Sequence, residues 1–472
     1  MRKKIINSLE RLACRMFILL IAAMGFISCS EESPALIPEP TEEEPIEEPK
    51  EEPGTNEEPT PIGRSRDILL SAEQQKLVDA TISTCFELFR IQNEIEKKKR
   101  NGEIEDEFAK VFYDTSNPAN IISSPLGMMW SLSMLANAAD GNSRQQIIES
   151  MNFDGYPIEK INSFFNFIGT QLMTLDSSSK LNIANSVWLR HMLRPYVKES
   201  FLNIMSDSFN APYKYIESFS PNYDGALINE WAARESDGFI NPFVYIPDAE
   251  NKFLLANLIY FNAGWTLPFD EEKSAEETFY NEDGTTSKVK MMSTDYRQFK
   301  KVSADEYVAL RMPYGNEAFA MIVVWPREDI DKALAEITDN PSRITNLAKD
   351  IIVVDGHILR IPKFDFKFTS VFNQIVNGLG IEEIFDESMA NFDGMLVDDP
   401  NGWTEAHASY AIQTCRISID EKKTEAGAGS YILGHSGENP DPLVITLDRP
   451  FLFFISERST GLPIFMGRIA QF

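Results

Sequence analysis

The chain has 472 residues, of which 43% are hydrophobic, and a formal net charge of −28. A chain of this length and composition buries a sizeable core in one or two domains. The negative charge argues against nucleic acid and anionic lipid surfaces as partners, because both are themselves negative. Twelve glutamates and one lysine between residues 31 and 62 concentrate about −11 of that charge in one short tract.

The first 28 residues are typical of a secretory signal peptide. Basic residues precede an apolar run at 16–27, which is too short to cross a bilayer as a helix. The run ends at Ser28-Cys29, which resembles a bacterial lipobox, although Phe26 stands where that motif prefers leucine. Ordinary secretion is the alternative, but we favour a lipid on Cys29 because an anchor also explains the next segment.

Residues 29–66 are predicted to form a disordered acidic stalk. Eight prolines between Pro34 and Pro61 are interleaved with glutamates, a composition that cannot bury a core. The acidic residues directly after Cys29 resemble surface-export signals of some bacterial lipoproteins, and a plain spacer is the alternative. We therefore expect a secreted protein that is lipid-anchored to the bacterial outer membrane and surface-exposed, with a periplasmic orientation left open.

The folded part is predicted to begin near residue 67 with a helix. Ser71 to Gln74 form a capping-box pattern, and apolar residues then recur at helical spacing through Phe89. The charged stretch 94–107 is expected to be an exposed extension or loop. Cys85 and Cys415 lie in apolar contexts and are expected to be small buried residues rather than a disulfide.

Strand patterns dominate the remainder of the chain. A short strand near 120–123 leads into an apolar helix that begins at Pro125, and 253–261 is apolar on both faces, as in a central strand. Asn257 is the one polar residue in that run and needs a partner. Further strands are predicted at 181–189, 308–312, 319–325, 357–361 and 411–419, with a hairpin at 451–456 and 463–468. The prediction is one α+β domain with a large sheet, over residues 67–472.

The connection from Ser418 to Arg449 is unusually long for a compact domain. Its first half is made of tiny side chains rather than of turn-forming residues. Connections of this length tend to be functional or disordered, so the segment is a candidate functional loop.

These segments together resemble the serpin family, and the match extends over nearly the whole folded part. It rests on an ordered set of motifs: Asn120-Ile-Ile-Ser-Ser-Pro125, Ile228–Ile240, Ala256–Phe269, Lys290-Met-Met, Arg311-Met-Pro-Tyr, Ile361-Pro-Lys-Phe364, Pro450–Phe454 and Phe465-Met-Gly-Arg468. The resemblance implies three β-sheets, about nine helices and an exposed reactive-centre loop at 418–449. It also implies a suicide inhibitor of endopeptidases, acting without a cofactor, rather than an enzyme.

In that mechanism the loop is cleaved and then inserts into the main sheet as a new strand, so its alternate side chains must be buried. Counting from Thr424, the inward positions are uncharged and mostly small, and the one charged side chain of the run, Glu425, faces outward. The implied hinge consists of Glu421, Thr424, Glu425, Ala426, Gly427, Ala428, Gly429 and Ser430. Lys423 occupies a hinge position that is normally glycine, which leaves the speed of insertion open.

The resemblance also assigns two polar sites within the sheet. Trp265 and Glu421 match the breach, where the sheet parts to admit the loop. Ser124 and Asn257 match the central shutter. Gly127 stands where a second shutter serine is usual, and Gln413 where a histidine is usual.

The scissile bond is less well defined. Counting from Glu421 places it at Gly437-Glu438, while counting back from Pro450 places it nearer Asn439. A small residue before the bond favours an elastase-like serine protease or a papain-like cysteine protease over a glutamyl-specific one. We expect a monomer whose partner is the target protease and whose only membrane contact is the lipid anchor.

The sequence also bears on two other function classes. An enzyme is disfavoured because the four histidines form no metal-ligand spacing and the sequence has no Gly-x-Ser-x-Gly elbow. The other class is a non-inhibitory serpin-fold carrier or surface interaction protein, and Lys423, Gly127 and Gln413 keep it open.

Overall fold

The structure is a computed structural model. It describes residues 65–104, 119–220, 223–243, 251–295, 297–349, 354–397, 399, 406–408, 411–421 and 443–472. The predicted lipid-attachment residue Cys29, the hinge residues 424–430 and the bond between Gly437 and Glu438 lie outside these ranges.

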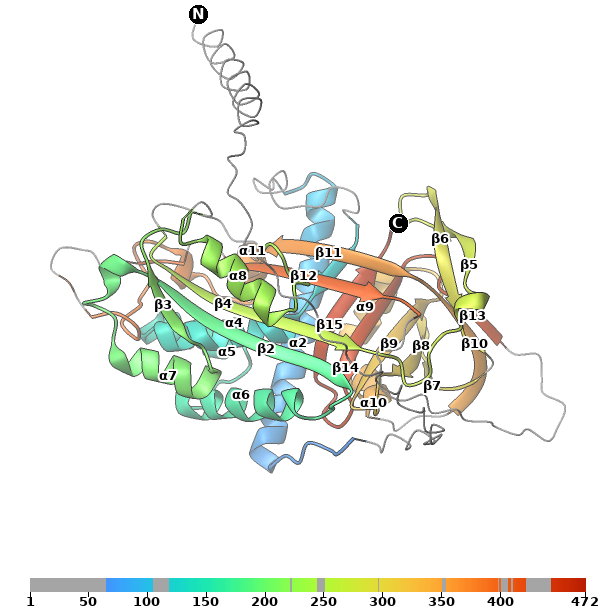
Figure 1. The fold of residues 1–472 in the computed structure, drawn as a ribbon, viewed down its shortest axis with the longest axis horizontal. Coiled ribbons are helices and arrows are strands. Elements are labelled where there is room, and N and C mark those ends of the chain that lie inside the picture. The colour runs from blue at the N-terminus through green and yellow to red at the C-terminus, as the bar shows by residue number, and fades with distance from the viewer. Residues whose placement is uncertain are drawn as a thin grey trace, which may run out of the picture. The chain divides into compact units, whose positions relative to one another are not determined.

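Nine α-helices occur within the described residues (Figure 1). They are α2 (Ala72–Arg100), α4 (Pro125–Ala138), α5 (Gly141–Ser150), α6 (Ile158–Met173), α7 (Glu199–Phe209), α8 (Ala226–Glu235), α9 (Ile330–Asp339), α10 (Ser342–Ala348) and α11 (Asn373–Gly378). The predicted capping box is confirmed, because the Gln74 backbone N–H donates to Ser71 Oγ and the Ser71 N–H donates to Gln74 Oε1. None of these helices is both long and apolar enough to span a membrane.

The prediction that residues 94–107 form an exposed extension or loop was only partly right: Glu94, Lys97 and residues 101–103 are exposed, and residues 105–107 lie outside the described ranges. Helix α2 continues to Arg100, and Glu96 is only 5% exposed. Ser370 Oγ donates to Glu96 Oε1 across 2.9 Å, and Lys99 Nζ lies 3.1 Å from the same oxygen. A buried carboxylate is tolerated when it is paired and hydrogen-bonded in this way. Ser370 and Lys99 therefore offset the cost of burying the charged side chain of Glu96.

The strands form three hydrogen-bonded sheets within the described part of the chain. The largest contains β1 (Ile121–Ser123), β15 (Pro463–Ile469), β14 (Phe451–Glu457), β9 (Phe319–Pro326), β8 (Tyr307–Pro313), β7 (Arg297–Ser303), β10 (Val354–Pro362), β6 (Thr286–Ser293) and β5 (Ala275–Tyr280), with β13 (Leu443–Thr446) beside β10. The second is β3 (Tyr213–Ile216), β2 (Ser179–Arg190) and β4 (Phe253–Ala263), and the third is β11 (Phe364–Val371) and β12 (Ile412–Ile419).

Strand β4 is covered on both faces, as its apolar run predicts. Ala256, Leu258 and Tyr260 face one side, where they form a small core with Trp231 of α8. Ile259 faces the other side and joins the main hydrophobic core. Helix α8 thus lies across one face of the sheet, as Figure 1 shows, and the main core fills the opposite face.

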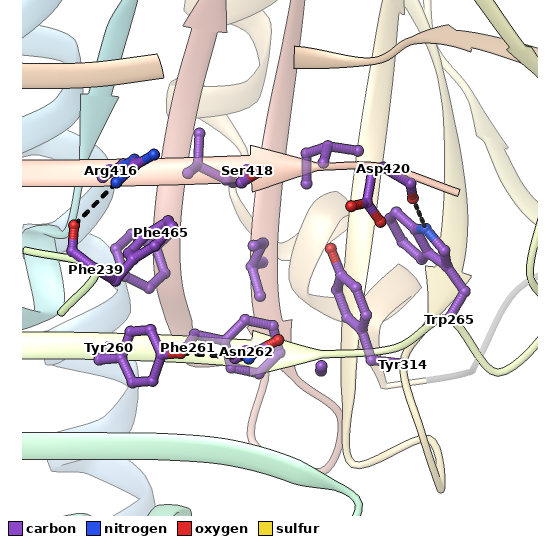
Figure 2. A pocket seen from close by; sticks show the side chains of 14 residues that line it. Phe239, Tyr260, Phe261, Asn262, Trp265, Tyr314, Arg416, Ser418, Asp420 and Phe465 are labelled. Carbon is purple, nitrogen blue, oxygen red and sulfur yellow. Dashed lines mark hydrogen bonds between the residues drawn. The ribbon is translucent and has the colours of Figure 1, made fainter. Parts of the chain in front are cut away.

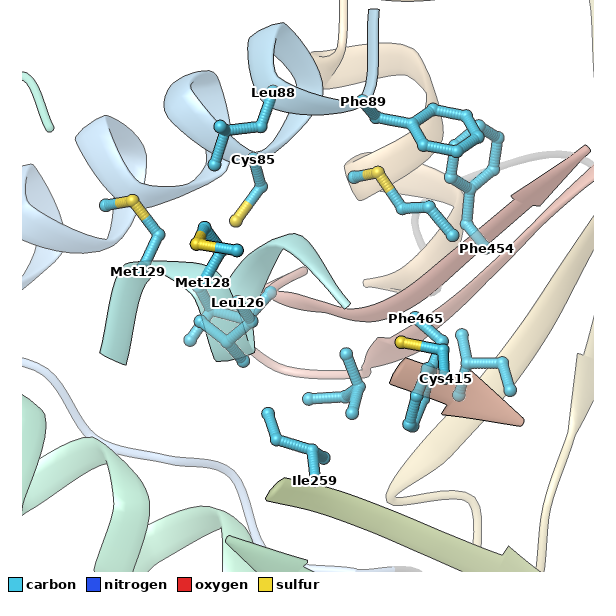
Figure 3. Close-up of a cluster of buried hydrophobic side chains, with 14 of the residues drawn as sticks. Cys85, Leu88, Phe89, Leu126, Met128, Met129, Ile259, Cys415, Phe454 and Phe465 are labelled. Carbon is cyan, nitrogen blue, oxygen red and sulfur yellow. The ribbon is translucent and has the colours of Figure 1, made fainter. Parts of the chain in front are cut away.

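The two cysteines of the described residues are buried and free, as predicted. Figure 3 shows Cys85 of α2 and Cys415 of β12 among apolar side chains of the main core, including Leu126 and Met128 of α4. Burial raises the pKa of the Cys415 thiol to about 12 and also raises that of Cys85. Both thiols are therefore protonated at neutral pH and behave as small apolar groups.

Candidate functional site

The neighbouring strands β4 and β12 leave an unpaired seam. They run side by side in the same direction (Figure 2), yet β4 forms a ladder with β2 and β12 with β11, and no described ladder joins β4 to β12. A cavity of about 370 Å³ lies between them, lined by residues 260–263 and 416–420. Unpaired strand edges present backbone donors and acceptors to an incoming strand, so the cavity suits an extended peptide.

Trp265 closes one end of this seam. Its ring stacks on Tyr314, with centroids 4.4 Å apart and planes at 15°, and its indole N–H donates to the carbonyl oxygen of Asp420 across 3.0 Å. Trp265 follows β4 and Asp420 follows β12, so one side chain connects the ends of both strands. The predicted breach residue therefore lies at this end of the seam.

Glu421, the last described residue in the first part of the loop, is held by two lysines. Its carboxylate is fully buried and lies 2.8 Å from Lys363 Nζ and 3.0 Å from Lys290 Nζ. Burial by itself raises the pKa of this carboxyl, but the hydrogen bonds from Lys363, from its own backbone N–H and from Lys290 lower it to about 2. The start of the loop is thereby fixed to the largest sheet, because Lys290 belongs to β6 and Lys363 follows β10.

The shutter residues form a second polar site below the seam. Ser124 caps α4 by accepting from Gly127 N–H, and its hydroxyl donates to Ile464 O across 2.8 Å. The side-chain amide of Gln413 pairs with the Ser124 backbone, donating to its carbonyl at 2.7 Å and accepting from its N–H at 3.0 Å. Gln413 therefore fixes β12 to the start of α4.

The side-chain amide of Asn257 is hydrogen-bonded to a residue of the neighbouring strand β2, not to Ser124. Its Nδ2 donates to Asn185 Oδ1 across 2.8 Å, and the two residues face each other in the β2–β4 ladder. A Cβ added at Gly127 would lie only 2.8 Å from Asn257 Oδ1 and 3.2 Å from Ser124 Oγ. Glycine at 127 therefore leaves the space that the Asn257 amide occupies.

The four predicted breach and shutter residues all lie at or near this seam: Trp265 at one end, and Ser124, Asn257 and Gln413 in the second polar site. The sequence did not point to Asn185, Lys290 or Lys363 as their partners. The available signals were an asparagine within the β2 strand pattern, facing Asn257, and two lysines inside otherwise apolar motifs. Within the described residues, no cluster of three or more His, Cys, Asp or Glu side chains is arranged to hold a metal ion.

A family model described as Serpin (serine protease inhibitor) matches residues 101–472, which is more than half of the chain. The protein therefore belongs to the serpin family. It is 27% identical to Serpin-Z10 of Arabidopsis thaliana over 76% of this chain and 93% of that one. It is 25% identical to plasminogen activator inhibitor 1 of Sus scrofa over 75% of this chain and 88% of that one.

Solved structures confirm the α+β serpin fold. The thermophilic serpin tengpin in its native state aligns with a TM-score of 0.70 and 23% identity, over 88% of this chain and 97% of tengpin. Human thyroxine-binding globulin complexed with thyroxine aligns with a TM-score of 0.68 and 21% identity, over 85% of this chain and 99% of that one. Similarities at these identities establish the fold alone.

Proposed function

We propose that the protein is a suicide inhibitor that traps a serine or papain-like cysteine protease by inserting its cleaved loop between β4 and β12. The unpaired seam and its cavity of about 370 Å³ carry this proposal. Strand addition to a sheet is a known mode of recognition, and insertion of a serpin's own reactive loop is an established instance of it. The described ends of the loop, Glu421 and Leu443, follow β12 and begin β13.

The length of the loop suits the seam. Residues 424–436 reach about 40 Å when extended, and the eleven residues of β4 extend about 35 Å. One end of the loop is fixed at Glu421, beside Trp265, so an inserted strand would run antiparallel to both β4 and β12. The backbone N–H and C=O groups of β4 and β12 along the cavity would then form hydrogen bonds with the inserted strand. These hydrogen bonds would favour insertion.

The covalent step follows the chemistry of acyl transfer. The protease nucleophile attacks the carbonyl carbon of Gly437, the bond to the Glu438 nitrogen breaks, and that nitrogen leaves as an amine carrying the transferred proton. An ester or thioester then joins Gly437 to the protease. Insertion that is faster than hydrolysis of this bond traps the complex, and slower insertion releases a cleaved inhibitor.

An elastase-like or a papain-like protease is the proposed target, with a glutamyl-specific one ranked below. Gly437 is small, and neither Gly437 nor Glu438 offers the basic or large aromatic side chain that trypsin-like and chymotrypsin-like enzymes select. Mass measurement of the small carboxyl-terminal fragment released on denaturing the complex identifies the scissile bond directly.

The test combines a gel with a melting curve. We expect an SDS-resistant adduct with the target protease, and a loop-cleaved protein that melts well above the intact one. An Ala428→Glu variant is the matched control: it places a charge on the inward face, so we expect cleavage without an adduct. If cleaved and intact wild-type protein melt together and no adduct forms, the protein is instead a non-inhibitory carrier or surface interaction protein.

We further propose that the mature protein is secreted and lipid-anchored at Cys29 on the outer surface of a bacterium. The support is the apolar run before Cys29 and the acidic, proline-rich tract after it. A Cys29→Ser variant is expected to lose the lipid mass and appear in the soluble fraction. Protease added to intact cells is expected to remove the wild-type domain, and protection from that protease would indicate a periplasmic orientation.

A further inference from the structure

The connection that follows α8 crosses the seam on the face that α8 covers. Asp237 and Gly238 have φ angles of 50° and 80°, and these left-handed residues reverse the chain after the helix. The Ile240 N–H donates to Ser236 Oγ across 2.9 Å, and Ile240 is buried in the small core beneath α8. This anchored turn fixes the position of Phe239 beside the cavity.

Phe239 contacts both strands that border the cavity. Its ring centroid lies 5.7 Å from that of Tyr260 on β4 and 4.5 Å from the guanidinium carbon of Arg416 on β12. Arg416 Nη1 also donates to the carbonyl oxygen of Phe239 across 3.2 Å. Figure 2 shows the Phe239 side chain between Arg416 and Tyr260.

Arg416 is itself held in a fixed orientation. Its Nε and Nη2 donate to the two carboxylate oxygens of Asp365 on β11, at 2.9 and 2.8 Å. This bidentate pairing orients the guanidinium plane, which leaves its face for the Phe239 ring. Lys367 of β11 forms a second hydrogen bond to the connection that follows α8, because its Nζ donates to Pro242 O across 3.3 Å.

We propose that Tyr260, Phe239 and Arg416 form a clasp over the cavity, and that Arg416 is the positioning residue that sets the rate of loop insertion. Side chains of a strand alternate between the two faces of its sheet. An inserted strand would therefore project every second side chain toward the face where Phe239 now lies. Phe239 must leave Arg416 before that strand can settle, so the strength of their contact opposes insertion.

This inference rests on the proposed function, and a protease-free assay separates the two. The probe is a synthetic peptide of residues 424–436, added to the full-length protein, with insertion followed by the appearance of a form of higher melting temperature. Arg416→Met loses both the cation–π contact and the hydrogen bond to the Phe239 carbonyl oxygen, so insertion is expected to be about tenfold faster. Phe239→Leu loses the ring contact but keeps that carbonyl, so a smaller acceleration is expected. The conservative Phe239→Tyr keeps the ring and is expected to insert at the wild-type rate.

Two further variants make the assay specific. Arg90 on α2 makes the same kind of bidentate pair, with Glu87 at 2.8 and 2.7 Å, so Arg90→Met removes an equivalent surface contact and is expected to leave insertion unchanged. The double variant Arg416→Met/Phe239→Leu is expected to insert no faster than Arg416→Met alone, because the contact between the Phe239 ring and the guanidinium is already lost in that variant. Additive effects, or an unchanged or slower rate in Arg416→Met, would overturn the clasp.

Hydrogen exchange without peptide tests the clasp independently of insertion. Amides of residues 416–420, 239–241 and 243 are expected to exchange faster in Arg416→Met than in wild type, and at wild-type rates in Arg90→Met. If the peptide enters no variant, the adduct and melting tests decide the proposed inhibitory function, and these exchange rates alone decide the clasp. Unchanged exchange in Arg416→Met would then refute it.

Discussion

Trp265 donates its indole N–H to the carbonyl oxygen of Asp420 and so connects the ends of two strands that share no ladder. The same ring stacks on Tyr314 at 4.4 Å. One backbone carbonyl at the end of β12 therefore couples the seam to the β8–β9 hairpin. Asp420 lies in the segment 418–449 that resembles a reactive-centre loop, so this bond connects the start of that segment to the end of β4.

Trp265→Phe is expected to loosen that end of the seam. The variant keeps an aromatic ring against Tyr314 but loses one hydrogen bond, which lowers the free energy of unfolding by about 1 kcal/mol. Insertion of the loop peptide should become faster, because one contact that holds the ends of β4 and β12 together is already absent. Urea unfolding and the melting-shift assay measure the two effects separately.

Trp188→Phe is the matched control for that experiment. Trp188 donates its indole N–H to Ser186 Oγ across 2.8 Å on β2, which does not border the cavity. A similar loss of stability with an unchanged insertion rate is expected. Equal acceleration in both variants would mean that general destabilisation, rather than the bond to Asp420, governs opening.

Glu421→Gln is expected to weaken the dependence of stability on acid pH. The folded-state pKa of Glu421 is about 2, below its value in an unfolded chain, so the unfolded chain takes up the proton first. Its ionic stabilisation is complete above about pH 5 and decreases as the pH falls toward 2.

The stability gap between wild type and Glu421→Gln should therefore narrow by roughly 1–2 kcal/mol between pH 6 and pH 3, measured by urea unfolding. Glu94→Gln removes a half-exposed carboxylate that pairs with Lys98 and serves as the control. Such surface pairs contribute little, so this variant should follow the wild-type pH profile. A constant gap for Glu421→Gln would contradict the assignment.

Gly127→Ala is expected to destabilise the shutter. The new Cβ would lie 2.8 Å from Asn257 Oδ1, so the amide must move and strain its bond to Asn185. A loss of about 1–3 kcal/mol is expected from overpacking of this kind. Combining Gly127→Ala with Asn257→Ala removes the clash, so the double variant should lose less than the sum of the two single changes.

Gln413→Leu is expected to cost about 2 kcal/mol, because the Ser124 N–H and C=O both lose a partner in a partly buried site. Gln146 makes a comparable pair of bonds at the surface, accepting from the N–H groups of Glu382 and Glu383. Gln146→Leu should cost less, because water replaces the lost side chain. Equal losses by thermal unfolding would show that Gln413 has no special role in the shutter.

The sequence predicted those parts of the fold that are specified by a pattern within a single segment. The apolar run of β4 and the capping box at Ser71 are local patterns and were confirmed. The buried position of Glu96 was missed because Ser370, which bonds it, is 274 residues away. At the site, Trp265 and Glu421 were identified from family motifs. The partner of Trp265 is the backbone carbonyl of Asp420, and every residue has such a carbonyl, so the sequence could not identify this hydrogen bond.

The pairing of β1 with β15 also governs how the chain can fold. Ile121 lies opposite Arg468 in that ladder, and every residue of β14 and β15 is buried. The largest sheet therefore cannot be completed until β14 and β15, which lie within residues 451–472, have been synthesised. This pairing joins residues that are far apart in the sequence, and such contacts slow folding. Closure of the largest sheet is therefore a late step in folding, which takes place after synthesis of the chain has ended.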